Sequence, residues 1–366
     1  MRHWMKEYDS SEVSIDECLE MLQDKSAQKR AAAAAGLGEI KDTLAVPALL
    51  GLLMNDTDPL VRTNAAVALG KIKDKSAVPA LLKVLMEDSA QEVRSNAALT
   101  LGEIGDLRGT VALLNIITQE KEGVLYQNAI IALGKIKDKS AVPALLKVMT
   151  EDASPEARSY AALALGDIGD PVAVPALLKV LMEAQEENVR KGAAVALGKI
   201  KDKSATPALL KILMEDSAED VRSQAALALG EIGDSTGVPA LLKVLTEAAQ
   251  EGIRLSATIA LGKIKDKAAI PALLKVLMED PSAEVRSQAA LALGDMGDKS
   301  VIPALLNVLM DDLASCVRIS ATDALSRVGD RSIVPTLLGV MTQDDDDEVR
   351  KAASEALRTI KMRLAR

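Results

Sequence analysis

Hydrophobic residues form two stripes at helical spacing within each stretch of about 32 residues, and residues 75–106 illustrate both. The first stripe consists of Val78, Leu81, Leu82 and Leu85. After a polar stretch at 88–92, the second stripe consists of Val93, Ala97, Thr100, Leu101 and Ile104. One-sided apolar stripes of this period are typical of amphipathic α-helices. The pattern therefore predicts two short helices joined by a turn, which together make a helical hairpin.

The ends of both predicted helices carry residues that commonly begin or end helices. Pro79 lies in the first turn of the first helix, where its missing N–H costs no hydrogen bond. We expect Ser76 to cap that helix, and Gly105 to end the second one in a left-handed conformation. Two short helices cannot bury their apolar faces alone, so neighbouring hairpins must stack.

The same hairpin recurs along nearly the whole chain with a period of 32 residues. Proline marks the first helix at Pro47, Pro79, Pro143, Pro175, Pro207, Pro239, Pro271, Pro303 and Pro335. Arginine recurs in the second helix from Arg30 to Arg350, and glycine near its end from Gly38 to Gly294. We therefore predict an all-α protein, an α-α superhelix (a solenoid) of about eleven helical hairpins.

The repeat register also predicts how the chain is divided. We expect residues 1–42 to contain an N-terminal segment and a degenerate capping repeat, residues 43–362 ten regular repeats, and residues 363–366 a basic tail. Ser14 and Glu17 predict a capping box at the start of the degenerate repeat. Irregular or polar ends are expected, since they stop a solenoid from stacking further.

Several of these columns resemble HEAT repeats. Pro79, Asp88 and the pair Val93–Arg94 match the proline, the turn aspartate and the Val-Arg pair of that family. The string at 93–106 is similar to the phycobilisome-lyase subfamily of HEAT-like repeats. The resemblance implies that the first helices lie on a convex side and the second helices line a concave side. For function it implies either a protein-binding scaffold or a bilin-lyase-like, phycobiliprotein-handling role.

One repeat, residues 107–138, departs from the pattern. Val111 stands in the proline column, Tyr126 stands in the arginine column, and the turn contains the polar run 119–123. Two interpretations stay open, a local irregularity of the superhelix or simple sequence drift.

Successive repeats alternate in type, so the underlying period is 64 residues. The column after the recurring glycine reads Glu39, Lys71, Glu103, Lys135, Asp167, Lys199, Glu231, Lys263, Asp295 and Arg327. Packed helices lie about 8–10 Å apart, so long side chains of opposite charge in adjacent repeats can meet. The alternation therefore predicts a ladder of ion pairs between repeats. The alternative is a charge pattern that serves a ligand.

A second column on the second helix is aliphatic where the assignment of the concave side predicts solvent. The helical wheel turns Val67 away from the first helix, together with Thr63 and Gly70. The column is Val67, Leu99, Ile131, Leu163, Val195, Leu227, Ile259 and Leu291. A contiguous apolar stripe is typical of an interaction surface, so we predict that these side chains bind a partner. The alternative is that tight curvature buries them between adjacent second helices.

A polar column lies beside this stripe. It consists of Asn64, Asn96, Asn128, Tyr160, Gln224 and Gln288. Side-chain amides here could bond the backbone of a partner, and the alternative is an ordinary solvated surface.

The amino-acid composition argues against several classes of partner and active site. The formal net charge of −9 argues against a nucleic-acid partner. The one histidine is His3, so a nucleophile–histidine pair is excluded, and so is the His-Glu iron site of the related deoxyhypusine hydroxylases. The two cysteines are too sparse for a zinc site. We expect no catalytic residue, no metal and no cofactor.

The remaining features concern location and partner. Two distant cysteines suggest a reducing compartment, and neither a signal peptide nor an 18-residue apolar stretch is present, so we expect a cytoplasmic protein without a membrane contact. The favoured function is a non-enzymatic scaffold that binds another protein on its concave face. The alternatives are a bilin-lyase-like activity and, third, a HEAT-like nucleic-acid binder. Nothing in the pattern indicates self-association.

Overall fold

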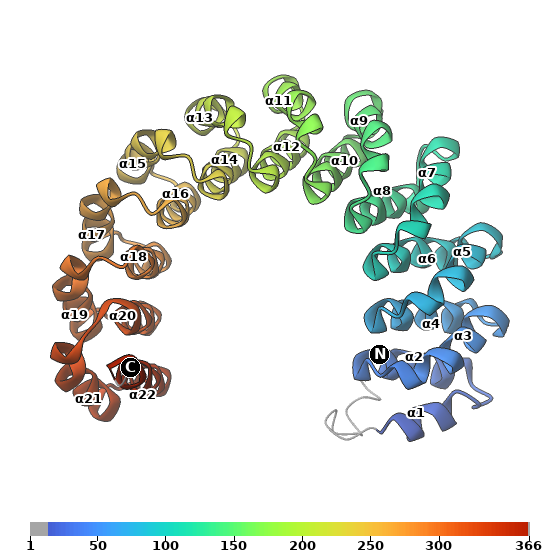
Figure 1. Ribbon diagram of the computed structural model, residues 1–366, viewed down its shortest axis with the longest axis horizontal. Helices are drawn as coiled ribbons and strands as arrows, with labels where there is room; N and C mark the ends of the chain where they lie inside the picture. The colour runs from blue at the N-terminus through green and yellow to red at the C-terminus, as the bar shows by residue number, and fades with distance from the viewer. Residues whose placement is uncertain (1–13, 365–366) are drawn as a thin grey trace. The chain divides into compact units, whose positions relative to one another are not determined.

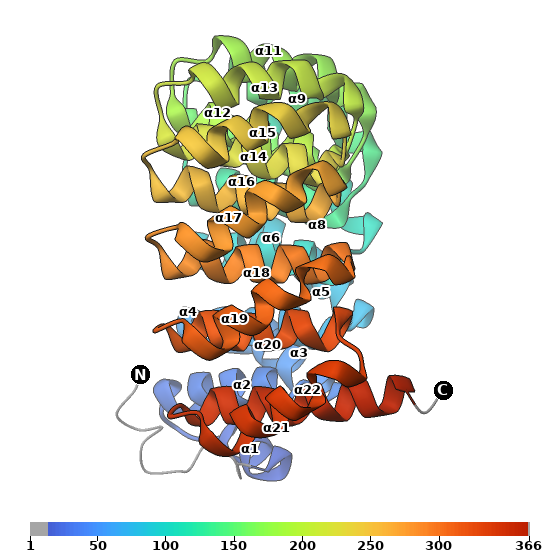
Figure 2. The same ribbon diagram turned by 90° about the vertical axis from the view of Figure 1, so that its left-hand side faces the viewer.

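The computed structural model describes residues 14–364, which form helices joined by short connections and, within that range, no strand (Figure 1). The chain divides into two compact units, residues 1–176 and 177–366, and each is treated on its own. Both are built from stacked helical hairpins, which confirms the predicted all-α solenoid. Figure 2 shows hairpins of the second unit stacked one on the next.

A short pair of helices precedes the regular hairpins, α1 (Ile15–Met21) and α2 (Ala27–Ile40). The first helices of the ten hairpins that follow are α3 (Val46–Asn55), α5 (Val78–Glu87), α7 (Thr110–Gln119), α9 (Val142–Glu151), α11 (Val174–Glu183), α13 (Thr206–Glu215), α15 (Val238–Glu247), α17 (Ile270–Glu279), α19 (Ile302–Asp311) and α21 (Val334–Gln343).

The second helices are longer. They are α4 (Pro59–Ile72), α6 (Gln91–Ile104), α8 (Val124–Ile136), α10 (Pro155–Ile168), α12 (Glu187–Ile200), α14 (Glu219–Ile232), α16 (Glu251–Ile264), α18 (Ala283–Met296), α20 (Ser315–Val328) and α22 (Asp347–Leu364). One turn of 3₁₀ helix leads into each hairpin, and these turns are η1 (Thr43–Ala45), η2 (Lys75–Ala77), η3 (Leu107–Gly109), η4 (Lys139–Ala141), η5 (Pro171–Ala173), η6 (Lys203–Ala205), η7 (Ser235–Gly237), η8 (Lys267–Ala269), η9 (Lys299–Val301) and η10 (Arg331–Ile333).

The two predicted stripes make the core of each hairpin. In α5, Val78, Leu81 and Leu85 are fully buried, while Leu82 is half-buried. In α6, the five residues of the predicted stripe are all buried. The core residues are mainly small and aliphatic, and Tyr126 in α8 is the one aromatic side chain buried among the described residues.

An aspartate begins each hairpin, and this corrects one prediction. The Asp74 carboxylate accepts a 2.8 Å hydrogen bond from the N–H of Ser76, which lies inside η2. Ser76 therefore does not cap α5, because the 3₁₀ turn places it before the helix. The same aspartate cap recurs at Asp42, Asp106, Asp138, Asp170, Asp202, Asp234, Asp266, Asp298 and Asp330.

The capping box at the start of α1 is confirmed. The Glu17 N–H donates to the Ser14 hydroxyl over 3.2 Å, and the Ser14 N–H donates to the Glu17 carboxylate over 3.1 Å. At the other end, α22 continues through Arg363, whose guanidinium donates to the carbonyls of Ser326 (3.1 Å) and Arg327 (2.6 Å).

The residue that ends each second helix from α2 to α18 is left-handed, but it is not always glycine, and Gly329 at the end of α20 is extended. Gly105 has φ 69° at the end of α6, as predicted. From α4 on, a lysine adopts the same conformation in alternate repeats, at Lys73, Lys137, Lys201 and Lys265, and Lys41 does so at the end of α2; their φ values lie between 59° and 62°. The 64-residue period is therefore also an alternation between a relaxed and a strained helix end.

Glycine further up the second helix lets neighbouring second helices come close. A Cβ on Gly102 would lie 2.7 Å from the Cα of Ala132, and a Cβ on Gly230 would lie 2.6 Å from that of Ala260. The first helices make far fewer contacts with one another. Within each unit the second helices thus form a tight inner row, and the hairpins curve toward it (Figure 1).

An arginine–aspartate clamp joins each of several second helices to the turn of the next hairpin. Each arginine donates two hydrogen bonds of 2.7–3.0 Å to the carboxylate at the turn of the next hairpin, in the pairs Arg30–Asp56, Arg62–Asp88, Arg190–Asp216, Arg254–Asp280, Arg286–Asp312 and Arg318–Asp344. Sequence reasoning found the arginine column and the turn aspartate Asp88, but neither the aspartate column nor the pairing. The constant separation of 26 residues between arginine and aspartate was the signal that could have shown it.

Candidate protein-interaction surface

The side of the second helices that is turned away from the first helices, here called the groove face, carries the predicted aliphatic column. Val67 is 37% exposed, and the other seven members are half-buried: Leu99, Ile131 and Leu163 in the first unit, and Val195, Leu227, Ile259 and Leu291 in the second. The column is thus neither hidden by curvature nor fully open. Each unit presents four aliphatic side chains at its inner surface.

The neighbours of this column are more buried than the helical wheel predicted. Thr63 is only 8% exposed. Gly70 packs against Thr100 of the next second helix, where a Cβ would lie 3.3 Å from the threonine methyl group. The prediction that both face the groove is wrong, because adjacent second helices approach closely enough to cover them. The exposed surface is a narrower strip centred on the Val67 column.

The polar column is half-buried, and three of its amides already donate to backbone carbonyls. Asn64 bonds Leu60 over 2.8 Å, and Asn96 bonds Glu92 over 2.9 Å, both within one helix. Asn128 instead crosses to the Ser95 carbonyl over 3.1 Å. These bonds hold the amides against the helices. Tyr160, Gln224 and Gln288 are also half-buried.

The alternating charges meet as predicted. Most of them form single ion pairs between two neighbouring repeats. Lys71 donates to Glu39 over 2.6 Å, and the pairs Lys135–Glu103, Lys263–Glu231 and Arg327–Asp295 have the same arrangement. Two carboxylates receive a second cation, Lys73 at 3.9 Å from Glu103 and Lys201 at 3.2 Å from Glu231. The hydrogen bond from Lys71 lowers the pKa of Glu39, and that from Lys263 lowers the pKa of Glu231. Because these pairs are exposed, each contributes only about 0–1 kcal/mol to stability.

Stripe, polar column and charges come together in one pocket of about 510 Å³ in the first unit. Val67, Leu99 and Asn96 line it, with Glu103 as the one carboxylate among its lining residues. Four lysines surround them, Lys41, Lys71, Lys73 and Lys135. This part of the groove face therefore combines aliphatic contact area with an excess of positive charge, although the whole chain is acidic.

The described residues hold no cluster of three or more His, Cys, Asp or Glu side chains that could bind a metal ion. His3 lies outside the described residues. Cys18 is buried and Cys316 is exposed, and both are free thiols. No helix among residues 14–364 is long and apolar enough to cross a membrane.

A family profile described as HEAT repeats matches the chain in six overlapping segments, residues 15–102, 54–124, 110–185, 174–262, 238–326 and 305–365. This chain belongs to the HEAT-repeat family. The profile covers nearly every described residue, so the family assignment applies to both units. No curated protein matches.

Solved structures place this HEAT-repeat chain among large solenoids. Yeast importin-β (Kap95p) matches with a TM-score of 0.59 at 16% identity, over 96% of this chain and 56% of its own. A Kap121p mutant matches with a TM-score of 0.59 at 17% identity, over 96% of this chain and 46% of its own. The HEAT-repeat chain thus spans about half the length of these relatives, and at such identities the likeness shows the fold.

Proposed function

We propose that this HEAT-repeat protein is a non-enzymatic scaffold that binds a protein partner on its groove face. The observation that carries the proposal is the aliphatic column, which stays partly exposed in all eight repeats that contain it. Soluble proteins rarely leave a continuous apolar strip open to water unless it meets a ligand or a partner. The second helices also hold the column rigidly, since they pack through glycine–alanine contacts.

The lysine pocket indicates the chemistry of the partner. After Lys71 and Lys135 have paired with Glu39 and Glu103, the positive charges of Lys41 and Lys73 are still in excess. A partner segment with aliphatic side chains and carboxylates would match both features.

The structural relatives are consistent with this use of the fold. Kap121p has been solved bound to Nup53p and bound to Ste12p, and both complexes match this chain with TM-scores of 0.57–0.58. Solenoids of this fold can therefore bind other proteins. We also propose a cytoplasmic location, on the basis of the two unpaired cysteines.

Substitution of three groove residues tests the proposal. Leu163→Asp, Val195→Asp and Leu227→Asp together should reduce recovery of the partner from an extract of the source organism by about tenfold or more, as expected when apolar anchors are lost. The matched control introduces Asp at Leu107, Val172 and Leu313, which are exposed but lie outside the groove face. If the groove variant keeps its helicity and recovers as much partner as the unchanged protein does, the proposal is wrong.

The resemblance of the string 93–106 to phycobilisome-lyase repeats supports a second candidate, a bilin-lyase-like handling of phycobiliproteins. Incubation of the protein with a bilin and an apo-phycobiliprotein would then give a coloured covalent adduct. An adduct would favour this candidate over the scaffold, and its absence would exclude a lyase role.

A further inference from the structure

The regular clamp between Arg62 of α4 and Asp88 at the end of α5 shows how a buried carboxylate is normally satisfied in this chain. The Arg62 guanidinium donates from Nε and Nη2 to the Asp88 carboxylate over 2.7 and 2.8 Å. Its Nη1 donates to the carbonyls of Asp56 (2.9 Å) and Thr57 (3.3 Å). The two charged side chains are only 11% and 8% exposed. One guanidinium therefore neutralises the aspartate and also closes the preceding turn.

The irregular repeat has the aspartate without the guanidinium. Tyr126 is 2% exposed and stands in the arginine column, and its hydroxyl donates to Asp152 Oδ2 over 2.5 Å. The Ser154 N–H donates to the other oxygen over 2.8 Å. Burial, with the hydrogen bond and the charge of Asp152, raises the pKa of Tyr126, so the phenol stays neutral. Asp152 thus accepts from a neutral hydroxyl and a backbone N–H, whereas Asp88 accepts from a guanidinium.

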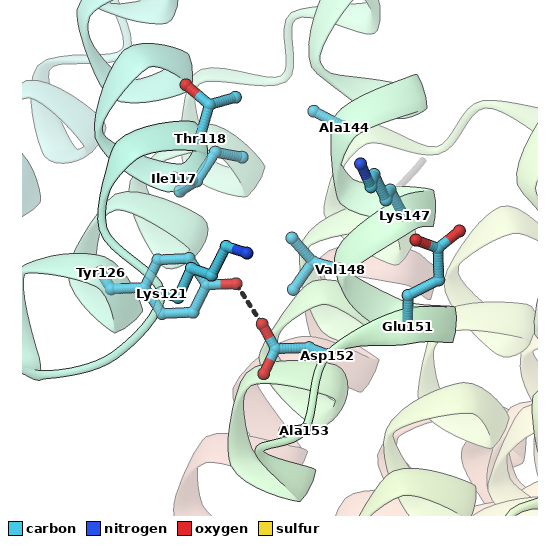
Figure 3. Close-up of a pocket in the computed structure, with 10 residues that line it drawn as sticks. All are labelled: Ile117, Thr118, Lys121, Tyr126, Ala144, Lys147, Val148, Glu151, Asp152 and Ala153. Atoms are coloured by element: carbon cyan, nitrogen blue, oxygen red, sulfur yellow. Dashed lines mark hydrogen bonds between the residues drawn. The ribbon is translucent and has the colours of Figure 1, made fainter.

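A larger pocket accompanies this substitution. Between α3 and α5 the pocket beside the clamp holds about 330 Å³, whereas the corresponding pocket between α7 and α9 holds about 410 Å³. Figure 3 shows the Tyr126 hydroxyl facing the Asp152 carboxylate, with Ile117 and Thr118 on the α7 side and Lys147 and Glu151 on the α9 side. The turn before α8 is also rebuilt, since Gly123 (φ 91°) precedes a helix of 13 residues instead of 14.

We propose that the pocket between α7 and α9 binds a guanidinium group of a ligand, which takes the place of the arginine that this repeat lacks. A planar guanidinium can donate two parallel hydrogen bonds to one carboxylate, as Arg62 does at Asp88. Ile117 and Val148 offer apolar contact for the methylene stem, and the Tyr126 ring lies beside the charge. This site lies in the outer layer and does not depend on the groove face.

The charges that line the pocket balance, so charge alone does not select the ligand. Lys121 and Lys147 line it together with Glu151 and Asp152, so the lining has no net charge and does not attract every cation. Recognition must come from the paired geometry of guanidinium and carboxylate, which an ammonium group cannot reproduce. We therefore expect arginine to bind and lysine to bind at least about tenfold more weakly.

The experiment uses L-arginine as the probe and the tyrosine ring signals of the full chain as the readout. The chain has three tyrosines, so ¹³C-tyrosine NMR gives few signals, and Tyr126→Phe assigns the one in the pocket. L-arginine should shift that signal saturably with a millimolar Kd, and L-lysine should not in the same range. Absence of a saturable shift with arginine, or an equal shift with lysine, would overturn the proposal.

Three variants separate a specific site from a general effect. Asp152→Asn should weaken arginine binding by about tenfold or more, whereas Asp88→Asn, at the regular clamp, should change it less than about twofold. Tyr126→Arg supplies the guanidinium from within, so calorimetry should show no arginine binding, and the melting temperature should rise. Arginine binding that survives Tyr126→Arg would contradict the proposal even if Asp152→Asn failed to fold.

The same titration distinguishes two sources of the guanidinium. A capped peptide Ala-Arg-Ala that binds as tightly as L-arginine would identify the ligand as an arginine side chain of a partner protein. Binding of free L-arginine that is about tenfold tighter would show that the lysines take up a carboxylate, and the ligand would be the free amino acid or a C-terminal arginine.

Discussion

At the scale of single residues, left-handed lysines are a source of strain that the sequence repeats five times. A non-glycine residue in this conformation costs about 1–2 kcal/mol, while a lysine beside a helix C-terminus recovers about 0.3–1 kcal/mol from the helix dipole. We predict that Lys265→Gly raises the free energy of unfolding by about 0.5–1 kcal/mol in urea denaturation. The reverse change, Gly233→Lys, is the control and should lower it. A loss of stability with Lys265→Gly would show that side-chain contacts outweigh the strain.

The arginine–aspartate clamps predict a loss of stability in acid. Burial acts to raise the pKa of Asp280, but the hydrogen bonds from Arg254 and from the Ser282 N–H outweigh it, so the pKa lies below the ordinary value of an aspartate. A carboxylate whose pKa is lowered by folding stabilises the fold above its unfolded pKa, and this contribution disappears as the pH falls through the folded value.

The urea midpoint should therefore be nearly constant from about pH 7 to pH 5 and fall below about pH 4. Asp280→Asn should lower the midpoint at neutral pH and make its decline in acid shallower. Asp311→Asn, on an exposed neighbour of the clamp at Asp312, is the control and should leave the profile unchanged. The idea fails if Asp280→Asn keeps the full acid dependence.

The sequence predicted local features only where they depend on a short stretch of backbone. The Ser14–Glu17 capping box and the left-handed Gly105 were predicted, since each depends on its own backbone alone. The cap by Asp74 was missed, because serine and aspartate are both good caps and only the 3₁₀ turn decides between them. The clamp was missed because it joins residues of different hairpins.

At the scale of helices, close contact between neighbouring second helices depends on glycine. Gly230→Ala would place a Cβ 2.6 Å from the Ala260 Cα, so the helices must move apart, and we predict a loss of about 1–3 kcal/mol in the free energy of unfolding. Gly339→Ala in α21 is the matched control. A Cβ there meets nothing within 4 Å, so the change should stabilise the helix by up to about 1 kcal/mol. Equal effects of both substitutions would mean that helix propensity, not packing, sets the outcome.

The hairpins themselves could be predicted from the period, but the distance between second helices could not. The apolar stripes of α5 and α6 determine which faces meet. A helical wheel treats a helix as isolated, so it placed Thr63 and Gly70 in the groove. In the structure the absence of a side chain at Gly70 lets the next helix cover that position. The departure at Tyr126 likewise gave no sign of the pocket beside it.

At the scale of the whole molecule, stacking contacts join each hairpin mainly to its neighbours. In such an array, stability is close to a sum of hairpin terms and nearest-neighbour terms. We predict that Gly230→Ala lowers the hydrogen-exchange protection of α13–α16 most, with progressively smaller changes along the second unit and little change in α3–α6. Mass spectrometry of exchanged peptides measures this directly. A uniform loss of protection along the chain would contradict nearest-neighbour coupling.

The aliphatic column was predicted correctly as a pattern, but its exposure was not decided by the sequence. Duplication copies residues whether or not they bind anything, so eight similar side chains are not eight independent observations. The structure adds that Val67 and its counterparts stay partly open while their neighbours are covered. This selective exposure supports the proposed function more strongly than the repetition does.

Site-specific photo-crosslinking tests the proposed groove face most directly. A benzophenone amino acid is placed at Leu227 on the groove face or at Met214, which is 38% exposed at the end of α13. Both variants are irradiated in an extract of the source organism. The proposal predicts that one protein partner crosslinks to position 227 and not to position 214. A partner that crosslinks at position 214 and not at position 227 would contradict the proposal.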